Sequence, residues 1–448
     1  MIQKAFFILF AFLSFSAYPQ LEFSGEVNLQ GMYSTGEELP FWMYKNQRGR
    51  IAENTNAAGW ITGKAIYDLG ATSNLEVGVG ILYQDGISDR VFLDESYLQF
   101  RNTWLEVIAG RKQMPELYNG LSATNENIVW SLNARPLPGV QFRTREPIML
   151  FPDAGLGFEA SLSEYLLEKD RHVSYARVHH KSLHLVYLPN EDWWIRAGIQ
   201  HFAQWGGNSK RFGQQPEGIK DYLLMFFGRE GGENANASDQ VNVLGNQLGS
   251  YELNIKRSFR DMDVEFIYNH MFEDGSGSRY VNFPDGRYGF SLDFRDEGRL
   301  VNNILYEFYY TKNQSINSTG PHQNDNYLNH GIYRNGWSYE QRTLGAPFFT
   351  YDKERDLIVN NKFMMHHIGI SGSISNYFES YPYKLMLSGG RNDGRYGAYF
   401  TPNEDVAYIS YEMLILQNFV DLSIQLGAEY HSLYSPLYGA GLHLSKQF

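Results

Sequence analysis

Two long connections between predicted strands carry side chains of the types that proteins use to bind sugars. Flat aromatic rings can cover the C–H faces of a sugar, and planar amides and carboxylates can pair with its hydroxyl groups. The candidates are His201, Gln204 and Trp205 in the connection 201–247, and Asp325, Asn326, Tyr327, Trp337 and Tyr339 in the connection 311–362. The same side chains also pack loops together, so the sequence leaves both roles open.

Arg135 stands at the mouth of another predicted strand, in the sequence Asn133-Ala134-Arg135-Pro136. Its planar guanidinium could bind both oxygens of a uronic-acid carboxylate. In a closed sheet with an acidic interior, it could equally pair with an interior aspartate or glutamate. Arg135 is therefore a further candidate for ligand binding, with internal pairing as the alternative.

Glu273, Asp274 and Asp285 offer hard oxygen ligands of the kind that Ca²⁺ prefers. Their spacing does not match the EF-hand loop, and ordinary turn chemistry explains the Gly, Asp and Ser residues around them equally well. They are weak metal candidates, and we expect neither a metal nor a cofactor.

Two His-x-Ser pairs have the spacing that some outer-membrane phospholipases use on one face of a strand. His443 and Ser445 face the interior of the predicted sheet, which is wrong for a lipid substrate, and His180 with Ser182 lies at a loop edge. The chain has no Cys, no Gly-x-Ser-x-Gly, no His-Glu-x-x-His and no Walker sequence. We expect no catalytic residues and no enzymatic activity.

The composition narrows the class of protein. The chain has 448 residues, a net charge of −12 and 16% aromatic residues. An acidic balance without a basic run argues against nucleic acid as a partner. With 43% hydrophobic and 20% charged residues, the chain is neither disordered nor a helical membrane protein.

The first twenty residues predict a secretory signal peptide. Lys4 precedes an apolar segment, residues 5–13, that is shorter than a transmembrane helix, and small residues follow it. We expect cleavage near residues 17–20, and a single domain formed by residues 21–448.

After that segment, apolar and polar residues alternate with a period of two along the chain. Val77, Val79 and Ile81 share one face, for example, while Glu76 and Gly78 share the other. The polar face carries many small and acidic residues, and the apolar face often begins or ends in an aromatic residue. The pattern is typical of a transmembrane β-barrel with a lipid-facing band, aromatic girdles and a wet interior. The last strand ends in Phe448, as do the assembly signals of bacterial outer-membrane barrels.

The alternation predicts an all-β fold, an antiparallel transmembrane barrel of eighteen strands with long extracellular loops. The long connections 201–247, 271–287 and 311–362 fall outside when the strands are counted back from Phe448, and short turns fall in the periplasm. The strands are predicted at 21–32, 59–69, 73–83, 91–100, 104–113, 138–150, 155–163, 182–188, 193–200, 248–256, 262–270, 288–294, 301–310, 363–374, 384–390, 406–416, 421–430 and 437–448.

Several stretches resemble the Wzi-like capsule-assembly family of the outer membrane, in its Bacteroidota form. They occur in order over about 300 residues: 39–47 (LPFWMYKNQ), 130–140 (WSLNARPLPGV), 201–207 (HFAQWGG), 242–250 (NVLGNQLGS), 272–277 (FEDGSG), 325–327 (DNY) and 336–337 (GW). Enterobacterial members carry a helical bundle facing the periplasm, but residues 21–130 show no long helical period, so we expect no such bundle.

The resemblance implies a non-enzymatic, lectin-like protein in the outer membrane of a Gram-negative cell. Its expected partners are capsular or other surface polysaccharide, outer-membrane lipid and the capsule export machinery, and we expect a monomer. The alternative is a porin, a diffusion channel for sugars or other small solutes. The long connections argue against it, because they hold enough chain to fill the lumen.

Overall fold

The computed structural model describes residues 21–87, 91–273, 277–316 and 324–448. The predicted signal peptide and the metal candidate Asp274 lie outside these residues. Within the described part of the chain, no helix is long and apolar enough to cross a membrane.

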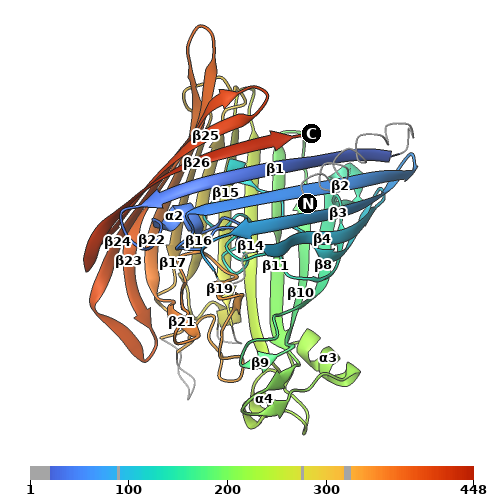
Figure 1. The fold of residues 1–448 in the computed structure, drawn as a ribbon. Coiled ribbons are helices and arrows are strands. Elements are labelled where there is room, and N and C mark those ends of the chain that lie inside the picture. The colour runs from blue at the N-terminus through green and yellow to red at the C-terminus, as the bar shows by residue number, and fades with distance from the viewer. Residues whose placement is uncertain (1–20, 88–90, 274–276, 317–323) are drawn as a thin grey trace, which may run out of the picture.

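The strands form one closed antiparallel barrel of 18 strands. The first strand pairs with the last, with Leu29 opposite Leu444, so blue and red ribbons lie side by side (Figure 1). Two short segments, β6 and β7, both pair with β8 and act as one interrupted strand. The wall consists of β1 (Leu21–Ser34), β2 (Ala57–Gly70), β3 (Ser73–Gln84), β4 (Val91–Arg101), β5 (Leu105–Arg111), β6 (Gly139–Thr144), β7 (Ile148–Phe151), β8 (Leu156–Leu166), β10 (Arg177–Tyr187), β11 (Trp193–Trp205), β14 (Asn246–Ser258), β15 (Asp263–Phe272), β16 (Gly286–Asp293), β17 (Asn303–Tyr310), β22 (Phe363–Ser375), β23 (Ser380–Arg395), β24 (Ala398–Gln417), β25 (Asp421–His431) and β26 (Tyr434–Gln447).

The predicted barrel is confirmed, and every predicted segment overlaps its strand in the wall. Four strands extend five or more residues beyond the prediction at the end with the long connections: β10 begins at Arg177, β11 ends at Trp205, β23 ends at Arg395 and β24 begins at Ala398. Residues 201–205 therefore belong to the wall, and the connection that was predicted to begin at residue 201 begins after them.

The outer face is apolar and the inner face is polar, the reverse of a soluble barrel. Val77, Val79 and Ile81 of β3 are exposed, whereas Glu76 is buried on the inside. One aromatic row circles part of the outer face because its members are register partners on adjacent strands. It contains Tyr268, Tyr288, Phe308 and His366. Such a row at the edge of an apolar band is the girdle expected of a transmembrane barrel.

Short turns gather at one end of the barrel and long connections at the other, which in outer-membrane barrels faces outward. The long connections carry the remaining elements, and α3, α4, β9 and β21 lie together at the lower end of the view in Figure 1. These elements are α2 (Phe41–Tyr44), α3 (Ile219–Phe226), α4 (Ala237–Val241), β9 (Val173–Ser174), β12 (Asn208–Ser209), β13 (Gly213–Gln214), β18 (Ser338–Tyr339), β19 (Arg342–Thr343), β20 (Thr350–Asp352), β21 (Leu357–Asn360) and the 3₁₀ turns η2 (Tyr118–Gly120), η3 (Pro152–Ala154) and η4 (Gly277–Arg279). In residues 21–130, as far as they are described, helix is confined to α2 and η2.

Three of these connections fold into the lumen and fill it. We call residues 39–52, 121–137 and 325–349 the lumenal plug. Its segments bind one another through the backbone: Ser131 N donates to Leu344 O at 2.8 Å, and Arg48 N donates to Leu132 O at 2.9 Å. The Trp337 indole is fully buried and donates to Val129 O at 2.7 Å. The hydrophobic core of the molecule therefore lies inside the barrel.

Candidate functional site

A buried ion pair ties the plug to the wall. Arg287 on β16 and Glu307 on β17 are both fully buried, with Nη2 and Oε1 2.6 Å apart. Glu307 also accepts hydrogen bonds from Ser122 Oγ at 2.7 Å and from Ala123 N at 2.9 Å. Because a buried carboxylate needs all of these partners, the plug segment that begins at residue 121 is fixed to these two strands.

A second buried carboxylate, Glu252 on β14, holds the following residues of the plug. It accepts hydrogen bonds from His184 Nε2 at 2.7 Å and from Gln200 Nε2 at 3.0 Å, and Arg196 Nη1 lies 3.2 Å away. Asn127 of the plug donates to the same carboxylate. The plug is therefore hydrogen-bonded to the barrel by charged groups and does not rest in it through apolar contacts alone.

Most of the predicted sugar-binding side chains lie in the plug or its supports. Gln204 donates to Gly336 O at 3.0 Å, and the Tyr327 hydroxyl donates to Asp285 Oδ2 at 2.7 Å. Two of the candidates, His201 and Asn326, are half-buried. The buried candidates are Gln204, Trp205, Asp325, Tyr327, Trp337, Tyr339 and Arg135. In this conformation protein atoms cover the buried ones, so direct contact with a ligand stays a prediction.

The structure does not bring the three candidates of β11 together. Phe202 and Gln204 point into the lumen, so His201 and Trp205, which alternate with them, lie on the outer wall. His201 Nε2 lies 2.5 Å from Gln247 Oε1, and Trp205 packs against Tyr222 of α3.

Arg135 forms an internal ion pair, the alternative that the sequence left open. Its Nη1 lies 2.8 Å from Glu340 Oε2, and its Nη2 donates to Leu93 O at 2.8 Å. Its predicted contact with a uronic acid is untested.

The two metal candidates within the described residues organise loops. Asp285 accepts hydrogen bonds from Asn313 N at 2.9 Å and from Gln314 N at 2.6 Å, and Glu273 accepts one from Leu328 N. Among the residues that the structure describes, no group of three or more His, Cys, Asp or Glu side chains is arranged to hold a metal ion.

The His-x-Ser residues make contacts of other kinds. His180 Nε2 lies 2.9 Å from Gln200 Oε1, and Ser182 Oγ lies 2.7 Å from Ser161 Oγ. His443 Nε2 lies 2.9 Å from Asn28 Oδ1. These polar contacts join neighbouring strands across the wall of the barrel.

Two connections, 167–176 and 311–362, meet at the outward end in a polar cluster that the sequence did not predict. We call His172, Asn335, Tyr351 and Asp356 the loop-tip cluster. Asp356 accepts hydrogen bonds from Asn335 Nδ2 at 2.6 Å and from the Tyr351 hydroxyl, and its Oδ2 lies 3.4 Å from His172 Nε2. The side chains of His172 and Asp356 are each 34% exposed, so the centre of the cluster is open to solvent.

Positive charges surround this cluster. Burial lowers the pKa of His172; Asp356 raises it, whereas Arg334, Lys210 and Arg171 lower it further. A carboxylate, an imidazole and nearby cations form a surface suited to a polymer with hydroxyl and carboxylate groups. Sequence spacing could not have revealed the cluster, since His172 lies more than 150 residues before Asn335, Tyr351 and Asp356, which share one connection.

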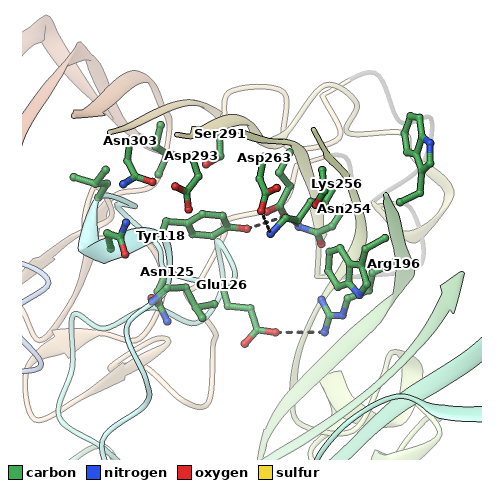
Figure 2. Close-up of a pocket in the computed structure, with 18 of the residues that line it drawn as sticks. Tyr118, Asn125, Glu126, Arg196, Asn254, Lys256, Asp263, Ser291, Asp293 and Asn303 are labelled. Atoms are coloured by element: carbon green, nitrogen blue, oxygen red, sulfur yellow. Dashed lines mark hydrogen bonds and ion pairs between the residues drawn. The ribbon is translucent and has the colours of Figure 1, made fainter. Parts of the chain in front are cut away.

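At the opposite end, a cavity of about 1130 Å³ lies between the short turns and the plug. We call it the vestibule, and Figure 2 shows its polar lining. The Tyr118 hydroxyl donates to Glu265 Oε1 at 3.0 Å, and Lys256 Nζ lies 2.8 Å from Asp263 Oδ2. Tyr118 comes from the segment leading into the plug, which separates the vestibule from the loop-tip cluster.

The comparisons with known proteins agree with this architecture. The family model of the capsule assembly protein Wzi matches residues 27–368. The solved structure of Wzi from Escherichia coli, described as an outer-membrane protein involved in group 1 capsule assembly and as a carbohydrate-binding β-barrel, is similar with a TM-score of 0.60 and 13% identity, over 94% of this chain and 83% of that chain. At that identity the likeness shows the fold.

Outer-membrane channels are also similar. OccAB4 from Acinetobacter baumannii has a TM-score of 0.49 and 7% identity, over 96% of this chain and 99% of that chain. OccK5 from Pseudomonas aeruginosa has a TM-score of 0.48 and 9% identity, over 96% of this chain and 98% of that chain. No curated protein sequence matches the chain.

Proposed function

The chain belongs to the Wzi capsule assembly family, and on that premise we propose that it binds secreted capsular polysaccharide and anchors it at the cell surface. It is an outer-membrane protein, with the long connections on the outside of the cell. The proposed role is lectin-like: the protein holds and organises the polymer without making or breaking its bonds.

The lumenal plug is the observation that carries this proposal. Charged hydrogen bonds at Glu307 and Glu252 hold it in the barrel, and its core is packed with aromatic side chains. A barrel filled in this way supplies a rigid support for surface loops. We propose that the buried candidates, such as Trp337 and Tyr327, act by holding that support in shape.

The loop-tip cluster is the proposed contact surface. It lies at the outward end, exposes planar polar groups and is surrounded by cations, as binding of an acidic or hydroxyl-rich polymer requires. Capsule export machinery, the other proposed partner, would approach from the periplasm and meet the short turns. The proposed unit is a monomer, because one barrel provides the whole cluster.

The alternative function is a diffusion channel for sugars or other small solutes. The vestibule favours it, because it is a polar cavity open toward the periplasm. The plug opposes it, because its packed segments lie between the vestibule and the outer face.

The proposal is tested by deleting the gene and measuring polysaccharide in the cell-attached fraction and in the medium. We expect polymer to move from cells to medium while total synthesis is unchanged, and the wild-type gene should reverse the change. An unchanged partition would overturn the anchoring role. Single-channel recording in planar bilayers would then decide whether the protein is a channel.

A further inference from the structure

Helix α3 lies against the outside of the barrel wall and does not cover the lumen. Phe202 stacks on Trp130 of the plug with ring centroids 5.5 Å apart, so Phe202 points inward. Its neighbours Ala203 and Trp205 belong instead to a separate cluster with Met225 of α3. Because side chains alternate across a strand, this cluster lies on the outer face. Figure 1 shows α3 at the side of the barrel, near the outward ends of the strands.

The inner side of α3 is attached to polar residues of the wall. Tyr222 of α3 packs edge-on against His179, with ring centroids 5.6 Å apart. Lys181 Nζ lies 3.9 Å from the centroid of the Phe226 ring, and Gln247 Nε2 donates to Met225 O at 3.2 Å. His179 is fully buried although it is on the outer face of its strand. The helix therefore has a fixed position and shields polar groups of the outer wall.

The other side of α3 is an uncovered apolar stripe. Ile219 is 80% exposed, Leu223 is 51% exposed and Phe227, directly after the helix, is 66% exposed. These residues are four apart in sequence, so their side chains follow one line along the helix. Val241 at the end of α4 is also exposed. Large apolar side chains gathered in this way usually contact another apolar phase.

The lipid-facing band of the barrel begins directly beside this helix. Lys181 of β10, which α3 contacts, is the register partner of His201. Two residues further toward the short-turn end, the next pair of side chains on the outer face is Leu183 with Ile199. Two residues along a strand span only about 7 Å. Leu183 and Leu185 are exposed on the outer face, as lipid-facing residues are. The apolar stripe of α3 thus continues the surface by which the barrel meets the membrane.

We propose that α3 is an interfacial helix that inserts Ile219, Leu223 and Phe227 into the outer leaflet, at the boundary of head groups and acyl chains. An amphipathic helix in such a position buries its apolar face in lipid. The helix would also steady the outer loops, because β12 in the same connection pairs with β9, next to His172 of the loop-tip cluster. This inference rests on the barrel and its lipid contact and is independent of polysaccharide binding.

The chain contains no Cys, which allows single spin labels to measure depth. The variants Leu223→Cys and Phe227→Cys place a label on the stripe. Leu185→Cys marks the lipid-facing band, and Glu230→Cys marks an exposed polar position in the same connection. Each labelled protein is reconstituted into liposomes of phosphatidylethanolamine and phosphatidylglycerol. Accessibility to oxygen, which concentrates in lipid, is compared with accessibility to a water-soluble nickel chelate.

We expect the labels at positions 223 and 227 to behave like the label at position 185. Their accessibility to oxygen should be high, and their accessibility to the nickel chelate should be several-fold lower than that of the label at position 230. Nickel accessibility equal to that at 230 would overturn the proposal. Spin–spin broadening at 223 that grows with protein density would also overturn it, since a second copy would then cover the stripe. The heat-dependent gel shift of folded barrels shows whether each variant has folded. If the variant at position 223 does not fold, the label at position 227 provides the test.

Discussion

At the scale of single residues, Asp356 is the group on which the loop-tip cluster depends. Its φ of 56° lies in the left-handed region, which Asn tolerates, so Asp356→Asn changes the chemistry with little backbone strain. The variant loses the charge and one acceptor, and the Asn335 amide then faces another amide. We expect polymer to bind about tenfold more weakly, the effect of losing roughly 1.5 kcal/mol.

Binding of purified capsular polymer to the reconstituted protein measures this effect. Asp153→Asn is the matched control, because it removes an exposed carboxylate at the short-turn end. Equal affinities for the two variants would show that the polymer does not contact the loop-tip cluster.

A second prediction for a single residue concerns pH. Burial raises the pKa of Asp285 to about 6, against the opposing effect of the hydrogen bonds that it accepts from Gln314 N, Tyr327 and Asn313 N. Because the pKa in the ordered loop is above the ordinary value of 3.8, the loop is most stable when Asp285 is protonated. That contribution is fully present below pH 3.8, is lost as pH rises through about 6, and is on the order of 3 kcal/mol.

Hydrogen exchange at the amides of Asn313 and Gln314, corrected for the intrinsic effect of pH, measures this loss. Protection should fall between pH 4 and pH 7 in the wild type and stay level over that range in Asp285→Asn. Protection that rises with pH would mean that the ionised carboxylate, with its hydrogen bonds, is the stabilising form.

At the scale of elements, the plug depends on the buried pair of Arg287 and Glu307. Glu307→Gln leaves the guanidinium without its counter-charge, and breaking such a pair costs about 3–5 kcal/mol. We expect the segment that starts at residue 121 to loosen and single-channel conductance to rise, while the barrel keeps its heat-dependent gel shift. Asp405→Asn is the control, since it breaks an exposed arginine pair on the wall, with Arg391. Conductance that is equal in the two variants would show that this pair does not hold the plug.

The elements of the wall could be predicted because lipid imposes one rule on every strand: apolar outside, with a period of two. The rule fails where lipid contact ends. Lys181 and His201 point outward but lie under α3, so polar residues there interrupted the pattern, and β10 and β11 were predicted too short. Both strands continue because the hydrogen bonds of the sheet do not depend on the side chains that face outward.

The site was less predictable than the wall. The candidates predicted in the connection 311–362 lie in that connection, whereas His201, Gln204 and Trp205 were predicted in a connection and belong to β11. The burial of Trp337 and Tyr327 could not be predicted from residue type alone. Tyr and Trp serve equally well in packing and in sugar contact. The loop-tip cluster joins residue 172 to residues 335, 351 and 356 of another connection, a contact between distant segments that no local pattern encodes.

At the scale of the whole molecule, each barrel presents one loop-tip cluster, whereas a capsular polymer repeats its sugars many times. Weak contacts from many copies in one membrane would then hold one chain, and linked sites of this kind can exceed a single affinity by about 10²–10⁴-fold. We therefore expect long polymer to bind liposomes that carry many copies far more tightly than nanodiscs that carry one. A fragment too short to reach a second copy should bind both equally, because it can engage only one cluster. If long polymer bound single-copy nanodiscs as tightly as crowded liposomes, retention would depend on one strong site per barrel, and the shallow, solvent-open loop-tip cluster could not be that site.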